Sequence, residues 1–150
     1  MEGELIECTI SDAEILYRWA NDSEVRQNAF NQNEIEWPDH HLEWLSKKLN
    51  SAHTLQYLLK SNGHFVGQIR FDLDESGEWI TDYSIDKNYR GLGYGKYIIS
   101  IGLDKVKSTG RAVIARVKPE NKASIHVFIS MGFEKIDNNK EYISFRLAKL

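Results

Sequence analysis

Hydrophobic and polar positions divide the chain into segments of two kinds. Segments in which apolar residues alternate with polar ones, or run together briefly, predict strands at residues 5–9, 55–59, 65–73, 78–85, 112–117, 133–136 and 142–147. Segments in which apolar residues recur every three or four positions predict helices at about residues 11–21, 39–49, 96–107 and 121–131. The order β-α-α-β-β-β-α-β-α-β-β predicts an α/β (α+β) fold, a mixed sheet with helices on its faces.

Several polar residues stand where these helices should begin or end. Ser11 with Glu14 three residues later has the spacing of a capping box, and Asp39 and Asn121 are suited to cap the next helices. Residues 21–23 should end the first helix, and residues 28–33 read as a loop. Trp19 should lie in the core, and Trp44 is predicted to pack there with Leu45.

Composition narrows the class of protein. The 150 residues are predicted to form a single domain (residues 1–150), and a net charge of −3 gives no general attraction to nucleic acid. Cys8 is the only cysteine, so no cysteine-based zinc cluster is expected and no metal is predicted. No apolar run has membrane-spanning length, and the acidic start lacks the features of a signal peptide, so we expect a cytoplasmic protein.

The stretch Arg90-Gly91-Leu92-Gly93-Tyr94-Gly95 joins a predicted strand to a predicted helix. Glycines allow the backbone to approach a ligand closely, and the first N–H groups of a helix attract anions, so the pattern predicts a phosphate cradle. The dinucleotide fingerprint does not fit, because its third glycine position holds Lys96. The P-loop does not fit either, because the spacing is one residue short and Tyr97 follows the lysine.

A second motif accompanies this turn: residues 121–133 contain an asparagine-led helix that ends in Gly-Phe. Together, Arg-x-x-Gly-x-Gly and this segment resemble the GNAT superfamily of N-acetyltransferases. The resemblance implies the GNAT fold, with a central mixed, mostly antiparallel sheet and helices on both faces, and implies acetyl-CoA as the cofactor. The residues implied to bind it are Tyr83, Ser84, Ile85, Arg90, Gly91, Leu92, Gly93, Tyr94, Gly95, Lys96, Asn121, Ser124 and Phe128.

The resemblance also implies a site of chemistry on the strand before the glycine turn. The backbone N–H of Ile85 should point at the thioester carbonyl, and Asp82 is a candidate base for the attacking amine. The tyrosine that protonates the leaving thiolate in the family is replaced here by Phe128. Tyr83 or water must then supply that proton, and a non-catalytic module that binds acyl-CoA stays open as an alternative.

The acceptor is predicted from a looser resemblance. Residues 19–26, Trp37, His41 and residues 66–72 resemble the nucleotide-amino-sugar N-acetyltransferases of pseudaminic acid synthesis. We therefore expect the acceptor to be an amino sugar of the UDP-4-amino-sugar type. A protein α-amine acetyltransferase of the ribosomal-protein type is the alternative, and a monomer or homodimer is expected. The predicted acceptor-binding residues are Arg26, Trp37, His41 and Arg70.

Overall fold

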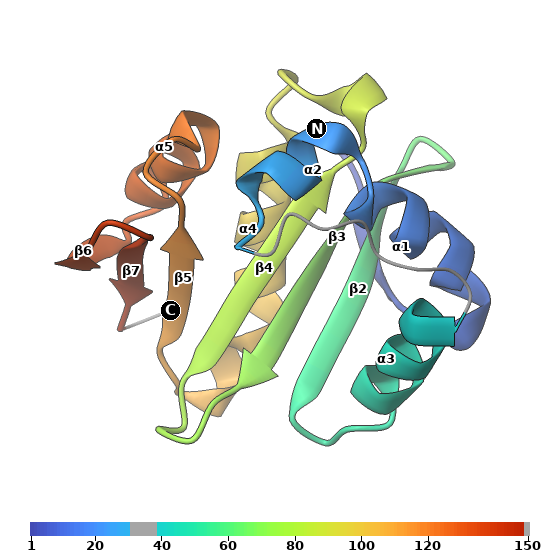
Figure 1. Ribbon diagram of the computed structural model, residues 1–150, viewed down its shortest axis with the longest axis horizontal. Helices are drawn as coiled ribbons and strands as arrows, with labels where there is room; N and C mark the ends of the chain where they lie inside the picture. The colour runs from blue at the N-terminus through green and yellow to red at the C-terminus, as the bar shows by residue number, and fades with distance from the viewer. Residues whose placement is uncertain (31–38, 149–150) are drawn as a thin grey trace.

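The computed structural model describes residues 1–30 and 39–148, with the backbone alone for residues 39 and 40. Within these residues seven strands form one sheet in the order β1-β2-β3-β4-β5-β7-β6 (Figure 1). Every neighbouring pair is antiparallel except β4 with β5. The strands are β1 (Glu4–Glu7), β2 (Thr54–Ser61), β3 (His64–Leu73), β4 (Trp79–Ile85), β5 (Val113–Val117), β6 (Glu134–Asn138) and β7 (Ile143–Leu147). The predicted mixed, mostly antiparallel sheet is confirmed.

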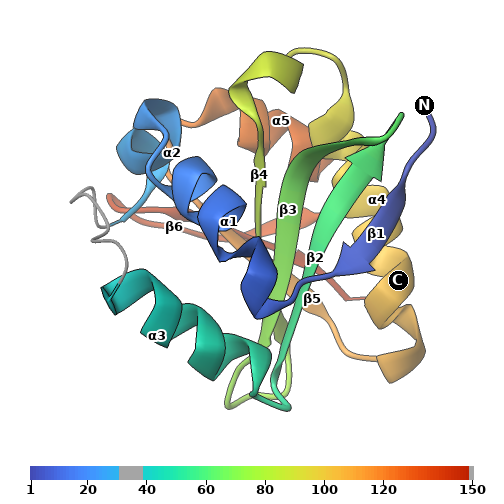
Figure 2. The same cartoon turned by 90° about the vertical axis from the view of Figure 1, so that its right-hand side faces the viewer.

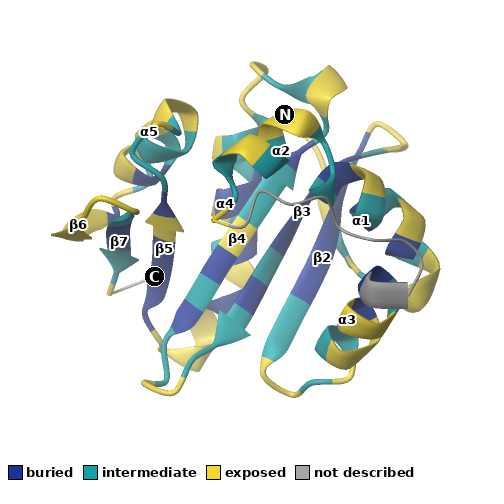
Figure 3. Cartoon of the chain, in the orientation of Figure 1, coloured by how far each residue is buried: buried dark blue, intermediate teal, exposed yellow. Residues whose placement is uncertain are grey.

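Helices cover both faces of this sheet, as predicted. Figure 2 shows α1 (Ala13–Ala20), α2 (Ser23–Asn28) and α3 (Asp39–Leu49) on one side, with α4 (Tyr94–Val106) and α5 (Lys122–Ser130) on the other. The larger apolar core lies under α4 and α5, and a smaller one joins α1 and α3 to β2. Figure 3 shows the consequence, with exposed residues concentrated on the outer sides of the helices and in the turns.

The sequence missed one helix and misplaced the start of another. The predicted end of the first helix at residues 21–23 is confirmed, since α1 ends at Ala20. A further helix, α2, begins directly after it and was not predicted, because Asp22 accepts hydrogen bonds from the backbone N–H groups of Glu24 and Val25 and so caps it. A 3-10 turn at Ile10–Asp12 precedes α1, and Asp12 accepts from the Thr9 N–H, so the capping contact lies ahead of the predicted one. The predicted cap at Asp39 lies outside the described side chains.

The sheet opens between its two parallel strands. β4 pairs with β5 only at Trp79↔Val113 and Ile80↔Ile114, although β4 continues to Ile85 and β5 to Val117. Beyond those pairs β4 remains bonded to β3, and β5 remains bonded to β7. The two halves of the sheet therefore separate here, and a backbone edge of β4 faces the gap.

Candidate functional site

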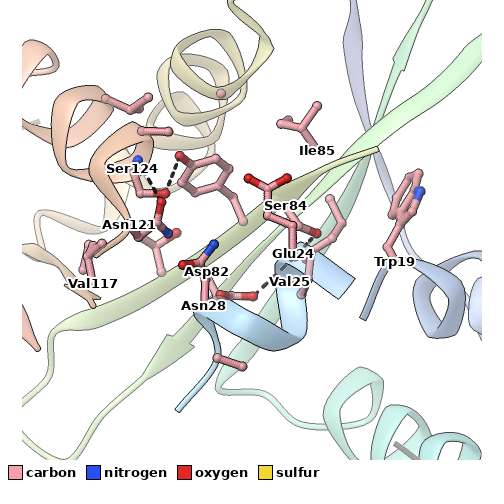
Figure 4. Close-up of a pocket in the computed structure, with 18 of the residues that line it drawn as sticks. Trp19, Glu24, Val25, Asn28, Asp82, Ser84, Ile85, Val117, Asn121 and Ser124 are labelled. Carbon is pink, nitrogen blue, oxygen red and sulfur yellow. Dashed lines mark hydrogen bonds between the residues drawn. The ribbon is translucent and has the colours of Figure 1, made fainter. Parts of the chain in front are cut away.

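A cavity of about 1220 Å³ begins in this gap and continues over the face of the sheet beneath α1, α2 and α3. The gap end is lined by β4, β5 and the starts of α4 and α5, and the other end by side chains of β2, β3, α2 and α3. Figure 4 shows β4 running through the middle, with Asn121 and Ser124 of α5 on one side and Trp19 of α1 on the other. One cavity thus has two differently built ends.

The exposed edge of β4 presents backbone groups to the gap. Asp86 donates its N–H to Val66 of β3, whereas Trp79 donates its N–H to Ala112 on the β5 side. Because successive residues of a strand turn their amide groups to opposite sides, Tyr83 and Ile85 face the same way as Trp79. Residues 81–85 all line the cavity. Of the three residues predicted to lie along the open edge, Tyr83 and Ile85 turn their N–H groups to the gap, whereas that of Ser84 faces β3.

The glycine turn ends at the same gap. Gly91 and Gly93 have φ values of 76° and 91°, and Gly93 is the N-cap of α4. Tyr97 donates its N–H to Gly93, so the N–H groups of Tyr94, Gly95 and Lys96 have no carbonyl within the helix to bond. These residues line the cavity, and free N–H groups at a helix start are the geometry that the predicted anion cradle requires.

One predicted residue of the turn points elsewhere. The Leu92 side chain does not line the cavity, and the residue is 60% exposed. Leu92 joins Gly91 to Gly93, and these two glycines, not Leu92, line the cavity.

Arg90, predicted to lie beside phosphates, is bound by α2. Its guanidinium donates to Asp22 at 2.8 Å, to Glu24 at 2.6 Å and to the Ile85 carbonyl at 3.0 Å. Partial burial alone would raise the Asp22 pKa, but Arg90 and the two capping N–H groups outweigh it and lower that pKa. Arg90 therefore fastens α2 to the end of β4.

A hydroxyl pair lies opposite the β4 edge. The Tyr83 hydroxyl and the Ser124 hydroxyl are 2.9 Å apart, and Ser124 donates its N–H to the Asn121 side chain. Burial, helped by the Asp82 charge and opposed by the Ser124 hydrogen bond, raises the Tyr83 pKa, so the phenol keeps its proton at neutral pH. Phe128 is buried in the core, with its ring edge-on to Tyr83.

The sheet face beneath α1, α2 and α3 is polar where it borders the cavity. Gln68 donates its amide N–H groups to Asp82 at 3.3 Å and to the Ser84 hydroxyl at 3.2 Å, and Gln56 donates to Gln68 at 3.3 Å. Asp82 itself is exposed to the cavity. A carboxylate held in place by a buried amide is a suitable acceptor for a proton from a bound amine.

Three of the predicted acceptor residues line this end of the cavity, and they differ in their contacts and in their burial. Arg26 lines it and donates to the Ala20 carbonyl at 2.6 Å. Arg70 lies with its guanidinium carbon 5.1 Å from the centre of the Trp44 ring. His41 is only 2% exposed, 2.9 Å from the Ala13 carbonyl, and burial lowers its pKa.

Two tryptophans differ from their predictions in opposite ways. Trp37 was predicted to bind the acceptor and lies outside the described residues. Trp44 was predicted to be core, and that is wrong, because it is 39% exposed and lines the cavity. The reason is the face of α3 that meets the sheet, where Leu45 is fully buried and its neighbour Trp44 turns toward Arg70.

Sequence reasoning missed Gln56, Gln68 and Glu24. The two glutamines occupy alternate strand positions between apolar residues, and that alternation was the one available signal.

Cys8 is not a competing nucleophile, because burial and the Asp12 charge raise its thiol pKa to about 12. Over the part of the chain that is described, no helix is both long and apolar enough to cross a membrane.

Comparisons with known proteins agree with this arrangement. A family model for the acetyltransferase (GNAT) domain matches residues 4–134. An uncharacterized protein of Methanocaldococcus jannaschii is 26% identical over 143 residues, covering 89% of this chain, and the chain spans only 28% of that protein. A solved domain from the same organism is 21% identical over 97% of both chains, with a TM-score of 0.85. A solved aminoglycoside acetyltransferase, in complex with ribostamycin and coenzyme A, is 16% identical over 97% of this chain and 93% of that one, with a TM-score of 0.84.

Proposed function

The chain belongs to the acetyltransferase (GNAT) domain family, and on this premise we propose that it transfers the acetyl group of acetyl-CoA to a primary amine. The observation that carries the proposal is the gap between β4 and β5, which ends at the anion cradle of α4. An unpaired strand edge and an anion site in one cavity match a ligand with a peptide-like arm and a pyrophosphate. The likeness to an aminoglycoside acetyltransferase with bound coenzyme A supports the same placement.

The residues present fit this cofactor. Gly91, Gly93 and Gly95 leave the cradle without side chains, and a Cβ added at Gly95 would already lie 3.4 Å from the Tyr83 ring. The N–H groups at the start of α4 bind the pyrophosphate, and Lys96 adds a positive charge at the cavity wall. The backbone groups of Tyr83 and Ile85 would hold the pantetheine arm by hydrogen bonds, as they would hold an added strand. When bound, acetyl-CoA supplies an activated thioester.

The chain's own groups then act on the reaction. Ile85 donates its backbone N–H to the thioester oxygen, where negative charge develops as the amine attacks. Asp82, directly or through water, accepts the proton that the amine must lose. Tyr83, which stays protonated at neutral pH, donates a proton toward the leaving sulfur and takes over the role for which Phe128 has no hydroxyl.

The acceptor we propose is an amino sugar carried on a nucleotide. The cavity extends from the β4 edge to Arg26 and Arg70, whose guanidinium groups suit a diphosphate, and Trp44 offers an aromatic face. A protein α-amine is the second candidate acceptor. The binding module without turnover, which Phe128 suggests, is the third reading.

One assay separates these readings. The protein is incubated with acetyl-CoA and either a UDP-4-amino-sugar or amino-terminal peptides of ribosomal proteins, and released thiol is measured against a reaction without amine. We expect release with the sugar. Release with peptides alone would replace the sugar by a protein acceptor. Binding of acetyl-CoA by calorimetry, with no release for any amine, would make the protein a binding module.

A further inference from the structure

The polar side chains of the cavity form rows across three strands. Gln56 on β2, Arg70 on β3 and Asp82 on β4 are neighbours in register, and Gln68 pairs with Ser84 in the next row. All five line the cavity, whereas the residues between them on the strands, such as Ile69, face the apolar core under α4. Figure 4 shows the two members of these rows that belong to β4, Asp82 and Ser84.

The hydrogen bonds along these rows have one possible direction. The Asp82 carboxylate can only accept, so Gln68 must turn its amide nitrogen toward it. The Gln68 carbonyl oxygen then faces Gln56, which must in turn offer its own amide nitrogen. The Asp82 carboxylate therefore fixes the orientation of both amides. The group of Gln56 that remains outside this chain of hydrogen bonds is its carbonyl oxygen, Oε1.

This oxygen lacks a partner. Gln56 is 7% exposed, and its Oε1 finds no hydrogen-bond donor among the residues that the structure describes. A buried acceptor left unpaired costs stability, so a native protein keeps one where something other than its own chain supplies the donor. Gln56 lines the cavity through its other atoms, so a bound molecule can be that donor once the side chain turns this oxygen into the cavity.

We propose that Gln56 determines the acceptor by accepting a hydrogen bond from a neutral donor, a hydroxyl or an amide N–H, at the far end of the amine substrate. The inference rests on the proposed function, because it treats Asp82 as the place of the reacting nitrogen. Gln56 and Asp82 are two strands apart, so the two ends of the acceptor are separated by about 10 Å.

Charge in the same rows favours a neutral donor over a second ammonium group. Arg70 lies between Gln56 and Asp82 in the register and pairs with Asp72 at 2.7 Å. Lys48 also contacts Asp72, at 3.1 Å, so two cations share this carboxylate. The charge nearest Gln56 in its row is therefore the Arg70 guanidinium, with the Asp82 carboxylate one strand further away, and this cation repels an ammonium and leaves a hydroxyl unaffected.

Three amines with the same six-carbon chain test this assignment: hexylamine, 6-amino-1-hexanol and 1,6-diaminohexane. The kcat/KM for thiol release is measured at saturating acetyl-CoA, with the diamine corrected for its two amino groups. For the wild type we expect the amino alcohol to exceed hexylamine by about tenfold or more, the effect of one hydrogen bond to a buried acceptor. The diamine should not exceed hexylamine.

Two variants ask whether Gln56 causes the preference. Gln56→Met keeps the length of the side chain and removes the acceptor, so the ratio of amino alcohol to hexylamine should fall to near one. Gln56→Glu places a carboxylate beside Arg70, so the diamine should become the best of the three. Lys47→Gln, exposed on α3 and outside the cavity, is the matched control and should keep the wild-type ratios. Thermal unfolding checks that each variant folds, and if Gln56→Met does not, Gln56→Glu decides.

A wild-type ratio near one, or a preference that survives in Gln56→Met, overturns the inference. The absence of thiol release with these three amines and with the UDP-4-amino-sugar would instead contradict the proposed function. In that case the Kd values of the same three compounds for the protein with bound CoA, in wild type and variants, decide the role of Gln56 by the same ratios.

Discussion

The two ends of the cavity differ in the groups that line them, which are backbone amides at one end and side chains at the other. At the gap end, which we propose binds the cofactor and call the cofactor end, the groups that face the cavity are backbone amides of β4 and of the first turn of α4, exposed by glycines and by the gap in the sheet. At the acceptor end they are side chains, Gln56, Gln68 and Asp82, brought together across three strands. A site made of backbone keeps its chemistry under most substitutions, whereas a site made of side chains changes with each one.

The strongest way to break the cofactor end is to alter the backbone itself. Gly93→Val places a β-branched residue at a φ of 91°, which should distort the cradle. Losing two charge-assisted hydrogen bonds should raise the Kd of acetyl-CoA by about 100-fold or more, measured by calorimetry. Gly110→Val is the matched control: its φ is 68°, it follows the last turn after α4, and it lies outside the cavity. Equal losses of affinity in both variants would contradict the placement.

A smaller effect is expected when the proposed proton donor on β4 is removed. Tyr83→Phe removes one hydroxyl, and we expect kcat to fall about tenfold while the Kd of acetyl-CoA changes little, because water remains as a poorer proton source. Steady-state kinetics and calorimetry measure the two quantities. Tyr57→Phe is the control, since Tyr57 is buried on the same face of the sheet as Tyr83 but lies outside the cavity. An unchanged kcat would remove Tyr83 from proton transfer.

Replacing Arg90 tests whether its guanidinium holds α2 in place or binds the phosphates of the cofactor. Arg90→Met releases α2 from β4 and should lower the free energy of unfolding by about 1 kcal/mol, because the pairs are partly exposed. The Kd of acetyl-CoA should change less than threefold. A tenfold weaker Kd would assign the guanidinium to the phosphates instead. Arg111→Met, which removes an exposed arginine bonded to Gly77, is the control.

The Arg90 contact also has a pH dependence with a defined sign. The Asp22 pKa is lower in the folded protein than its ordinary 3.8, so the stabilisation is present above pH 3.8 and is lost as pH falls through the lower, folded value. The difference in unfolding free energy between wild type and Arg90→Met should therefore be constant from pH 7 to 5 and shrink below 3.8. A difference that shrinks already near pH 6 would point to another group.

The cofactor end could be predicted from the sequence because local rules create it. Two glycines that need positive φ, a strand before them and a helix after them are all visible within residues 79–107, and the predicted family is confirmed. The order of strands and most helices followed from periodicity for the same reason. In such segments each residue's conformation depends mainly on its neighbours in the chain.

The rest could not be predicted because it depends on partners distant in sequence. α2 has only six residues, too few for a hydrophobic period, and its cap is visible only in hindsight. Arg90 finds its carboxylates 66 and 68 residues away. Gln56 and Asp82 are joined through Gln68 by strand register, which no single segment reveals. The acceptor therefore remains a prediction, whereas the family does not.

The two residue pairs that join β4 to β5 also have a thermodynamic meaning. A ligand that fills the gap acts as a missing strand between the two halves of the sheet and binds only the folded chain. At a hundred times its Kd, such a ligand adds about 2.7 kcal/mol to folding. On the proposed function, the melting temperature should then rise with the concentration of acetyl-CoA.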